Sequence, residues 1–482
     1  MVVVLGHVDH GKSSILEAIK DLKITSKESG GITQHIAAYE VEHQGKKITF
    51  IDTPGHEAFS AMRSRGANAA DIAILVVAGE EGVKEQTKEA ILHIKEAEIP
   101  MIVAINKIDK PEANPEKVKR ELAAQDVLTE SMGGKVPSIE LSAKTKKGIT
   151  DLLEMVLLIS EMENLKVDVS KSPDGYIIES YMDSLRGPSV TLIVKEGTLK
   201  KGDVLGTDSA AGKIKILEDF QGKVIDAALP SMPAIVLGFE NLPKTGESFR
   251  VFKNTEEAKS GVRKEKKPDL NQVLAESGVK SLNLVLKADV LGSIEAIREV
   301  LKDLPKDKAV LRILKEDVGD VNESDVKLAK GTEAAIVGFR VKVNSVARHL
   351  AEREKIRIKT FDVIYEFAKA VRDALERTLE PETVRTDLGR VKIVVVFKTD
   401  KGRQIVGGKV INGKITRGLQ VEVQRNKEVV GKGKIIGLER DKKSAGEVLK
   451  GSECGISYEG NVRLEEGDVL QAYSEEKIKA VL

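Results

Sequence analysis

The sequence predicts a multidomain protein of mixed α/β and β class. Its 482 residues are too many for one hydrophobic core. Residues 1–165 and 271–361 alternate apolar strands with helical stretches, which is the pattern of α/β domains. Residues 170–253 and 381–482 instead contain short strands punctuated by glycine, which predicts a β-barrel in each region.

Five apolar strands organise the first region into a doubly wound parallel sheet. Helical stretches separate them, and ligands bind such sheets at the carboxyl ends of the strands. The strand sequences are VVVL at 2, ITFI at 48, DIAILVVA at 71, MIVAIN at 101 and SIELSA at 138.

The segments further along the chain suggest spacers and scaffolds. Residues 254–270 are highly charged, which predicts a linker or an exposed helix. Residues 271–361 should form an α/β/α layer domain, but none of its strand ends carries a phosphate-type glycine loop, so we expect a scaffold or relay there. Apolar residues at helical spacing predict one connecting helix over residues 362–380, of which Asp362 to Leu379 would form a rod of about 27 Å at roughly 1.5 Å per residue. GTLKKGDVL at 197 and GKITRGLQV at 413 echo each other, which indicates two similar barrels and two docking surfaces.

Composition limits the compartment and the partners. Cys454 is the only cysteine, so no intramolecular disulfide is possible and a reducing compartment fits. No apolar run approaches the roughly 20 residues that span a bilayer, so we expect a cytoplasmic protein without membrane contact. The net charge of +1 argues against a whole-molecule grip on nucleic acid. Between Pro381 and Lys450, however, 17 Lys and Arg face 8 Asp and Glu, which indicates either a solvated β surface or an RNA-facing patch.

A phosphate-binding loop is predicted directly after the first strand. GHVDHGKS satisfies the pattern G-x-x-x-x-G-K-[ST] between a strand and a helix beginning near Ser14. Its backbone N–H groups would wrap the β-phosphate, Lys12 would neutralise the β and γ oxygens, and Ser13 would give an oxygen to Mg²⁺. We expect His7, His10 and His35 to brace loops or face solvent. The candidate site comprises Gly6, His7, Val8, Asp9, His10, Gly11, Lys12 and Ser13.

Two further motifs select guanine over adenine. Asp109, in the segment NKID after the strand MIVAI, can accept hydrogen bonds from both N1–H and N2–H₂ of guanine, whereas adenine would leave it unpaired. In the same segment Asn106 would brace the loop or reach N7, and Lys107 would lie over the ring. A backbone N–H of the segment SAK, after the next strand, can meet guanine O6. We therefore predict GTP and GDP as ligands of Asn106, Lys107, Ile108, Asp109, Ser142, Ala143 and Lys144.

The segment DTPGH completes the candidate nucleotide site with Asp52, Thr53, Pro54, Gly55 and His56. Asp52 would hold Mg²⁺ through a water, and the N–H of Gly55 would approach the γ-phosphate. Thr33 lies between the two motifs, where it could add a second hydroxyl to Mg²⁺, so loss of the γ-phosphate would release both segments. His56 could be a base, a metal ligand, a water holder or a plain loop residue. No metal-ligand partners surround it in the sequence, and Mg²⁺ prefers oxygen, which removes the metal role.

These motifs together resemble the translational GTPases. GHVDHGKS, GGITQHI and DTPGH, followed by a barrel, an α/β layer, a long helix and a second barrel, are similar to the bacterial translation initiation factor 2 family over essentially the whole chain. The resemblance implies a ribosome-dependent GTPase. It would place formylmethionyl initiator tRNA on the small (30S) subunit and promote joining of the large (50S) subunit, alongside other initiation factors and as a monomer. The long N-terminal region usual in the family is expected to be absent or removed.

The resemblance also assigns individual roles. Val8 and Ile32 would form an apolar gate past which His56 turns on the ribosome to orient the attacking water, while Asp9 would help to place a cation or water at the phosphates. The end of the charged tRNA would contact Arg440, Lys442, Glu453, Cys454 and Gly455.

Departures in the last barrel keep other functions open. Gly408 stands where the family often has a cysteine, and LERDKK places Glu439 and Asp441 where basic and aromatic residues are usual. Cys454 also fits the role of a small buried hydrophobe. The alternatives are a GTP-dependent RNA-binding or assembly module that holds no charged tRNA, and an elongation-type carrier.

Overall fold

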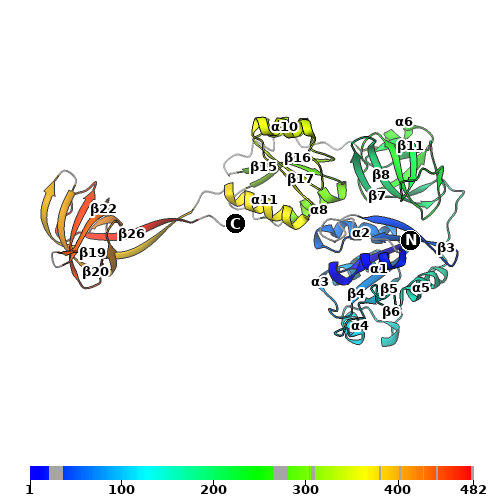
Figure 1. Ribbon diagram of the computed structural model, residues 1–482, viewed down its shortest axis with the longest axis horizontal. Helices are drawn as coiled ribbons and strands as arrows, with labels where there is room; N and C mark the ends of the chain where they lie inside the picture. Colours follow the sequence, from blue (N-terminus) through cyan, green and yellow to red (C-terminus); the bar gives the residue numbers. More distant parts are fainter. Residues whose placement is uncertain are drawn as a thin grey trace. The chain divides into compact units, whose positions relative to one another are not determined.

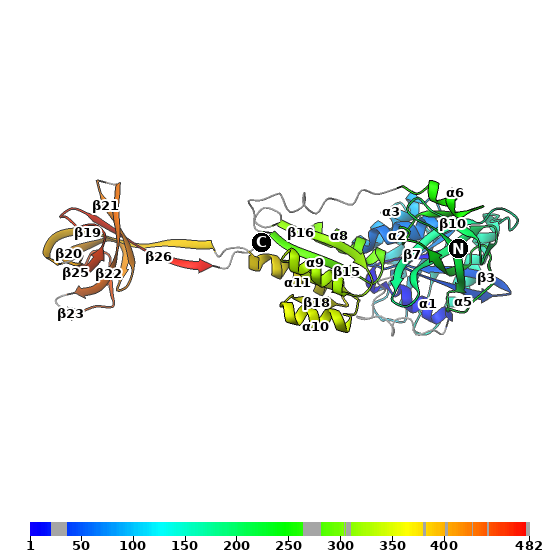
Figure 2. The same cartoon turned by 90° about the horizontal axis from the view of Figure 1, so that it is seen from above.

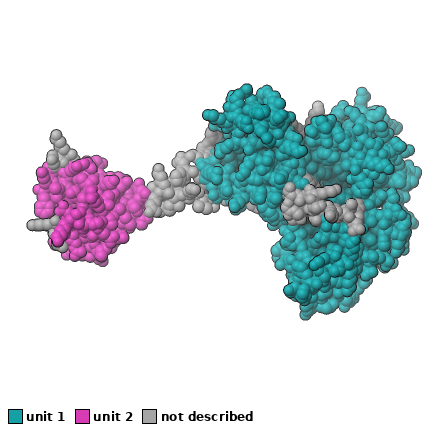
Figure 3. Space-filling model, viewed as in Figure 1, with its two compact units in different colours: residues 1–378 teal, residues 379–482 magenta. Residues whose placement is uncertain are grey.

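The structure is a computed structural model that describes residues 1–20, 36–263, 281–302, 304, 310–378, 382–400, 403–426, 428–440 and 443–478. These residues divide into two units, Met1–Thr378 and Leu379–Leu482, which Figure 3 colours teal and magenta. Within the described residues, no helix has both the length and the apolar character to cross a membrane. The predicted fold class is confirmed: a phosphate-loop α/β domain is followed by β domains that include a closed six-stranded barrel.

The first domain is a six-stranded sheet in the order β2-β3-β1-β4-β5-β6. All neighbours are parallel except β2, which runs antiparallel to β3. Alternate residues of β1 enter two apolar clusters, because Val3 and Leu5 face one side and Val2 and Val4 the other. Helices therefore cover both faces (Figure 1). The strands are β1 (Val2–Gly6), β2 (Ala37–His43), β3 (Lys46–Asp52), β4 (Ile72–Ala78), β5 (Met101–Asn106) and β6 (Ser138–Glu140). The helices are α1 (Lys12–Lys20), α2 (Ser60–Ala69), α3 (Glu85–Glu96), α4 (Pro115–Ala123), α5 (Ile149–Met162), and the short η1 (Val8–His10), η4 (Glu57–Phe59) and η5 (Glu130–Met132).

The antiparallel edge strand β2 was not predicted from the sequence. Its residues AAYEVEH mix apolar and charged side chains, so they show no continuous apolar run. A two-residue turn joins it to β3, with Gln44 and Gly45 both at positive φ, 49° and 72°. Such a turn favours a hairpin, and the pair Gln44-Gly45 is the signal that could have predicted it.

The second domain is a closed barrel in the order β10-β11-β13-β8-β7-β14. Part of the segment predicted as a linker is a short helix, α6 (Thr255–Ser260), which buries Ala258 against the barrel. The barrel strands are β7 (Asp174–Asp183), β8 (Gly187–Glu196), β10 (Val204–Gly206), β11 (Ala211–Asp219), β13 (Pro233–Phe239) and β14 (Ser248–Phe252), and the small pair is β9 (Leu199–Lys200) with β12 (Ala227–Ala228).

The third domain is a parallel sheet in the order β16-β15-β17-β18, with helices along its faces. Its last helix, α11 (Ile364–Thr378), corresponds to the predicted connecting helix but begins two residues later. It is not a free rod, because its apolar side buries Ile364, Phe367 and Val371 in the same cluster as Phe339. The other elements are β15 (Ser281–Ala288), β16 (Val310–Val318), β17 (Ala335–Phe339), β18 (Ile358–Phe361), α8 (Leu291–Lys302), α9 (Glu323–Gly331) and α10 (Ser345–Glu354).

The second unit closes into a barrel of its own. Strands β19, β26, β21, β22, β25 and β20 pair in a ring, because β19 also pairs with β20. One end of β19 and one end of β26 continue past the ring as an antiparallel ribbon (Figure 2). The strands are β19 (Glu382–Asp400), β20 (Arg403–Thr416), β21 (Gln420–Arg425), β22 (Glu428–Arg440), β23 (Lys443–Ser444), β24 (Glu447–Leu449), β25 (Glu453–Gly460) and β26 (Val469–Ile478).

Candidate functional site

The predicted phosphate loop lies between β1 and α1, at the carboxyl edge of the parallel sheet. Two of its positions require glycine. Gly6 has φ +142°, and a Cβ there would lie 2.3 Å from the carbonyl oxygen of Val76. Gly11 has φ +87°, and a Cβ there would lie 2.5 Å from Nδ2 of Asn106. The loop is therefore held tightly against β4 and β5.

Lys12 is a buried cation whose acceptors are backbone carbonyls. Its Nζ donates hydrogen bonds to the oxygens of Gly6 at 3.0 Å and His7 at 2.9 Å. Burial, opposed by nearby Asp52 and assisted by Arg63, holds the pKa of Lys12 below its usual value. The surroundings of Lys12 therefore do not fully balance the positive charge of its ammonium group, and an anion bound beside it would do so.

Asp52 and Ser13 bring two hard oxygen ligands together at the strand end. The Ser13 hydroxyl lies 3.4 Å from Oδ2 of the fully buried Asp52. Mg²⁺ prefers carboxylate, hydroxyl and water oxygens, so this pair fits the ion that phosphate transfer requires. Thr53, the next residue, donates its hydroxyl to the carbonyl of Val4 at 2.9 Å and fixes the segment to β1.

Gly55 lies directly against the phosphate loop. Its φ is outside the left-handed region, so its backbone conformation suits any residue. A Cβ there would nevertheless lie 2.4 Å from Nζ of Lys12 and 2.6 Å from Cα of Val8. Only glycine lets the DTPGH segment approach the loop this closely, and the contact of its N–H with a γ-phosphate stays a prediction.

Asn106 connects three loops at the other side of the site. Its Nδ2 donates to the carbonyl of His10 at 2.9 Å, and its Oδ1 accepts from the N–H of Ala143 at 3.1 Å. Of the two roles left open by the sequence, the structure thus shows the brace. The side chain joins the phosphate loop to the segments NKID and SAK, so the predicted contacts for phosphate and base form one continuous surface.

Asp109 is the acceptor available to a base in this surface. Its Oδ1 accepts a 2.6 Å hydrogen bond from the Ser142 hydroxyl. That bond is the main reason why the pKa of Asp109 is lowered, so the side chain is ionised at neutral pH. Neighbouring Lys107 has φ +63° and places its Nζ 2.9 Å from Glu80. Ile108 donates its N–H to Leu141, and Lys144 adds positive charge near Asp109.

His56 is almost fully buried and held in place by its neighbours. Its Nδ1 accepts the N–H of Ala58 at 2.9 Å and caps η4, so the neutral ring carries its proton on Nε2. That Nε2 has no partner among the described residues. Burial, then the charge of Arg63, lowers the pKa of His56 to about 4. The ring also contacts two aromatic side chains, Phe59 at 6.0 Å and Tyr365 at 4.2 Å between ring centroids.

Arg63 is a buried contact of the DTPGH segment that was not predicted from the sequence. Its fully buried guanidinium donates to the carbonyls of Pro54, at 3.1 Å, and His56. It also pairs with Glu89 of α3 at 2.6 Å. Arg63 therefore holds the DTPGH segment by its backbone. The surrounding sequence AMRSRG has no pattern that marks one arginine as buried.

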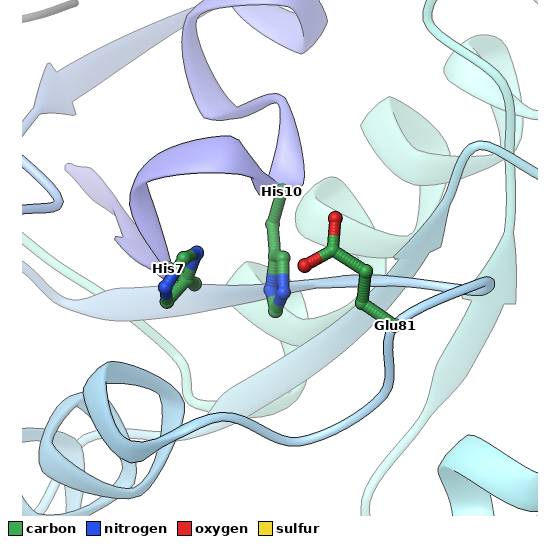
Figure 4. Close-up of side chains that lie close together, drawn as sticks. All are labelled: His7, His10 and Glu81. Carbon is green, nitrogen blue, oxygen red and sulfur yellow. The ribbon is translucent and has the colours of Figure 1, made fainter.

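His7, His10 and Glu81 lie close together beside the phosphate loop (Figure 4). One potential ligand atom from each lies within 4.8 Å of the others, and Nε2 of the buried His10 has no partner in the described chain. A cation would have to compete here with lysine ammonium groups. Burial is the main reason why the pKa of both histidines is lowered, and the charge of Lys12 lowers both further, with Lys84 acting on His7 and Lys107 on His10. We therefore interpret the cluster as a brace, consistent with the hydrogen bond between Nδ1 of His10 and the carbonyl of Val76 at 3.2 Å.

Of the predicted tRNA contacts, Arg440 in β22 and Glu453, Cys454 and Gly455 in β25 lie on adjacent strands of the second unit. Gly455 in β25 pairs with Glu439 in β22, next to Arg440. Cys454 faces inward: it is 6% exposed, and its Sγ lies 3.5 Å from the carbonyl of Gly408 in β20. Burial raises the pKa of its thiol to about 11, which fits a small apolar core residue. Glu453 is exposed. Thr33, Ile32 and Lys442 lie outside the described residues.

Comparison with known proteins covers nearly the whole chain. The family models for the elongation factor Tu GTP binding domain, elongation factor G domain 2 and translation-initiation factor 2 match residues 1–161, 172–252 and 256–372. A translation initiation factor IF-2 from Halothermothrix orenii is 45% identical over all of this chain and 72% of its own length. Another, from Pelotomaculum thermopropionicum, is also 45% identical, but the chain spans about half of it, 51%. The crystal structure of GDP-bound aIF5B from Aeropyrum pernix is 27% identical with a TM-score of 0.43, covering 98% of this chain and 91% of that one.

Proposed function

The chain belongs to the translation initiation factor IF-2 family and is a translational GTPase, and from this membership we propose that it hydrolyses GTP on the ribosome while positioning formylmethionyl initiator tRNA. In this proposal the tRNA is placed on the 30S subunit and the 50S subunit then joins. The observation that carries the nucleotide part is the buried, undercompensated Lys12 beside Gly55, Ser13 and Asp52, a combination that suits a triphosphate.

Binding precedes chemistry in this site. Lys12 and the loop N–H groups hold the β and γ oxygens, and Asp109 accepts from guanine N1–H and N2–H₂. Mg²⁺ held by Ser13, by Asp52 through a water and by Thr33 would neutralise charge on the phosphate oxygens. Because phosphoryl transfer depends mainly on positioning and electrostatics, the N–H of Gly55 supports the reaction by fixing the γ-phosphate.

His56 supplies the conditional step. With its Nδ1 bonded to Ala58 and its pKa near 4, the ring is neutral at physiological pH. A neutral imidazole can orient a water through one nitrogen without taking a proton from it first. We propose that the ribosome moves His56 out of its buried position, past Val8 and Ile32, so that it orients water toward the γ-phosphate.

The two barrels are proposed as RNA-facing parts. In the first barrel, Lys200, Lys201, Lys213 and Lys215 line a pocket of about 780 Å³ in which Asp226 is the single acidic lining residue. Such a cationic surface suits a ribosomal RNA backbone. In the last barrel, some basic residues are already paired with carboxylates. Arg385 lies 2.8 Å from Glu422, and Arg425 lies 2.9 Å from Asp468.

A binding and turnover experiment tests this function. Filter binding would compare formylated, unformylated and uncharged initiator tRNA, with an elongator aminoacyl-tRNA as a fourth ligand. In parallel, GTPase turnover would be measured with ribosomes, with and without initiator tRNA. We expect preference for the formylated tRNA and strong ribosomal stimulation. Equal affinity for all four would support the RNA-binding or assembly alternative, and preference for the elongator tRNA would support the carrier alternative.

A further inference from the structure

Tyr365 contacts the predicted catalytic histidine from a different domain. It lies in the first turn of α11, more than 300 residues after His56 in the chain, and the two ring centroids are 4.2 Å apart with a 55° tilt. The two rings are therefore in direct contact, at a separation just below the roughly 4.5 to 7 Å usual for aromatic pairs. Burial, then the charges of Asp9 and Glu57, raises the pKa of the Tyr365 phenol, so its hydroxyl is neutral at physiological pH.

The helix that carries Tyr365 is held rigidly, although the Tyr365 side chain is about half exposed to solvent. The side chain is 57% exposed, but its neighbour Ile364 is completely buried. Phe367, less than one turn further, makes edge-to-face contacts with Phe339 at 6.3 Å and Phe361 at 5.8 Å. The ring therefore projects from a helix fixed to its own domain, and it can restrain a side chain of the GTPase domain.

Two features favour departure of His56 from its position: a buried donor without an acceptor and an adjacent cavity. Its Nε2–H is buried without an acceptor among the described residues, and such a donor is costly. A cavity of about 780 Å³ adjoins the ring, lined by residues that include His56, Gln86, Val300 and Tyr365. Gln86 also accepts the N–H of Val8 at 3.1 Å, so one residue that lines this cavity contacts the phosphate loop. The bond from Ala58 and the contact with Tyr365 oppose departure.

We propose that Tyr365 is a positioning residue that holds His56 in its withdrawn position and thereby keeps GTP hydrolysis slow away from the ribosome. The inference rests on the proposed role of His56 in hydrolysis. It adds a restraint from the third domain to that role, so the position of α11 determines how readily His56 leaves.

The size of the effect follows from the aromatic contact. Pairs of this kind shift an equilibrium by between about twofold and twelvefold beyond simple burial. Removing the ring with Tyr365→Ala should raise the rate of GTP hydrolysis by the isolated protein by this factor. The Kd of GTP should not change. Among the ring contacts of the described residues, Tyr365 contacts His56 and no other residue of the predicted nucleotide site.

The experiment compares three variants without ribosomes under single-turnover conditions. Tyr365→Ala should be faster than wild type, Tyr365→Phe should match wild type because it keeps the ring, and Glu366→Ala should also match because this neighbour is exposed on the same turn. Histidine-labelled NMR titration provides a second readout. The pKa of His56 should rise from about 4 toward the ordinary value in Tyr365→Ala alone, because the imidazole gains water.

The outcomes separate a restraint from a structural role. A Tyr365→Ala protein with a native melting temperature, an unchanged His56 pKa and an unaccelerated rate would overturn the proposal. Acceleration by Glu366→Ala as well would attribute the effect to a loosened helix and would also overturn it. Because these assays contain no ribosome or tRNA, they are independent of the tRNA-binding test. The variant Tyr365→Ala/His56→Ala should lose the acceleration, and if it kept it, His56 would not be the restrained group.

Discussion

Gly55→Ala tests the close approach between the DTPGH segment and the phosphate loop. The added Cβ would lie 2.6 Å from Cα and 2.7 Å from N of Val8, and these backbone atoms cannot move aside as a side chain would. Restoring ordinary contact at 3.4 Å requires a displacement of about 0.8 Å. Since a misplacement near 1 Å can cost on the order of a hundredfold in rate, we expect ribosome-stimulated hydrolysis to fall by about that factor.

The assay should separate the γ-phosphate from the rest of the nucleotide. Equilibrium binding of labelled GTP and GDP would accompany single-turnover hydrolysis. We expect weaker binding of GTP and a smaller effect on binding of GDP, because the proposed contact of the Gly55 N–H is with the γ-phosphate. Gly331→Ala is the matched control, since a Cβ there meets nothing within 4 Å and its φ is ordinary. If Gly55→Ala behaved like this control, the segment would not be packed against the loop as described.

Three further predictions address the base, the buried arginine and the pH response. Asp109→Asn should raise the Kd of GTP by on the order of 10² to 10⁴, because one of the two acceptor oxygens becomes an NH₂ donor that opposes a guanine donor. The same change should improve binding of xanthosine triphosphate, whose C2 oxygen can accept from the new amide, and unchanged preference in a competition assay would refute the base contact. Arg63→Met should lower the free energy of unfolding by about 3 kcal/mol in urea titrations, because it removes a fully buried guanidinium and its pair with the partly buried Glu89. Arg63→Met/Glu89→Gln should recover part of the loss, and equal midpoints for wild type and Arg63→Met would contradict this. Burial lowers the pKa of His10 to about 3 and of His56 to about 4, so below pH 6.5 the unfolded chain binds more protons than the folded protein. The free energy of unfolding should therefore fall as pH drops from 6.5 to 5, by up to about 1.4 kcal/mol per pH unit for each histidine. A urea midpoint that stays constant across this range would show that neither histidine is buried in its neutral form.

Local patterns were sufficient for much of the nucleotide site. The phosphate loop and NKID each follow an apolar strand, and strand ends of a parallel sheet lie at one edge. Lys12, Asp52 and Asn106 therefore occupy the neighbourhood that their motifs predicted. The apolar side of α11 followed from helical spacing in the same way, because Ile364 and Phe367 are buried as that spacing requires.

Long-range packing could not be predicted in this way. The partners of Arg63 are backbone carbonyls and Glu89, and no local rule states which arginine of a helix will be buried. The pairing of Tyr365 with His56 joins segments from two domains, so it depends on how those domains pack. Cys454 shows the same limit. A family motif identifies the residue, but the register of β25 against β20 determines that its side chain points inward.

The central claim is that the wild-type protein uses His56 in hydrolysis only when the ribosome places it. The most direct measurement is single-turnover GTP hydrolysis by wild type and His56→Ala, with and without ribosomes, together with the Kd of GTP for both proteins. We predict that His56→Ala loses ribosomal stimulation by orders of magnitude while its GTP affinity stays nearly intact. If hydrolysis and affinity fell together, His56 would serve the structure of the site, and the account of a histidine withdrawn until the ribosome acts would be wrong.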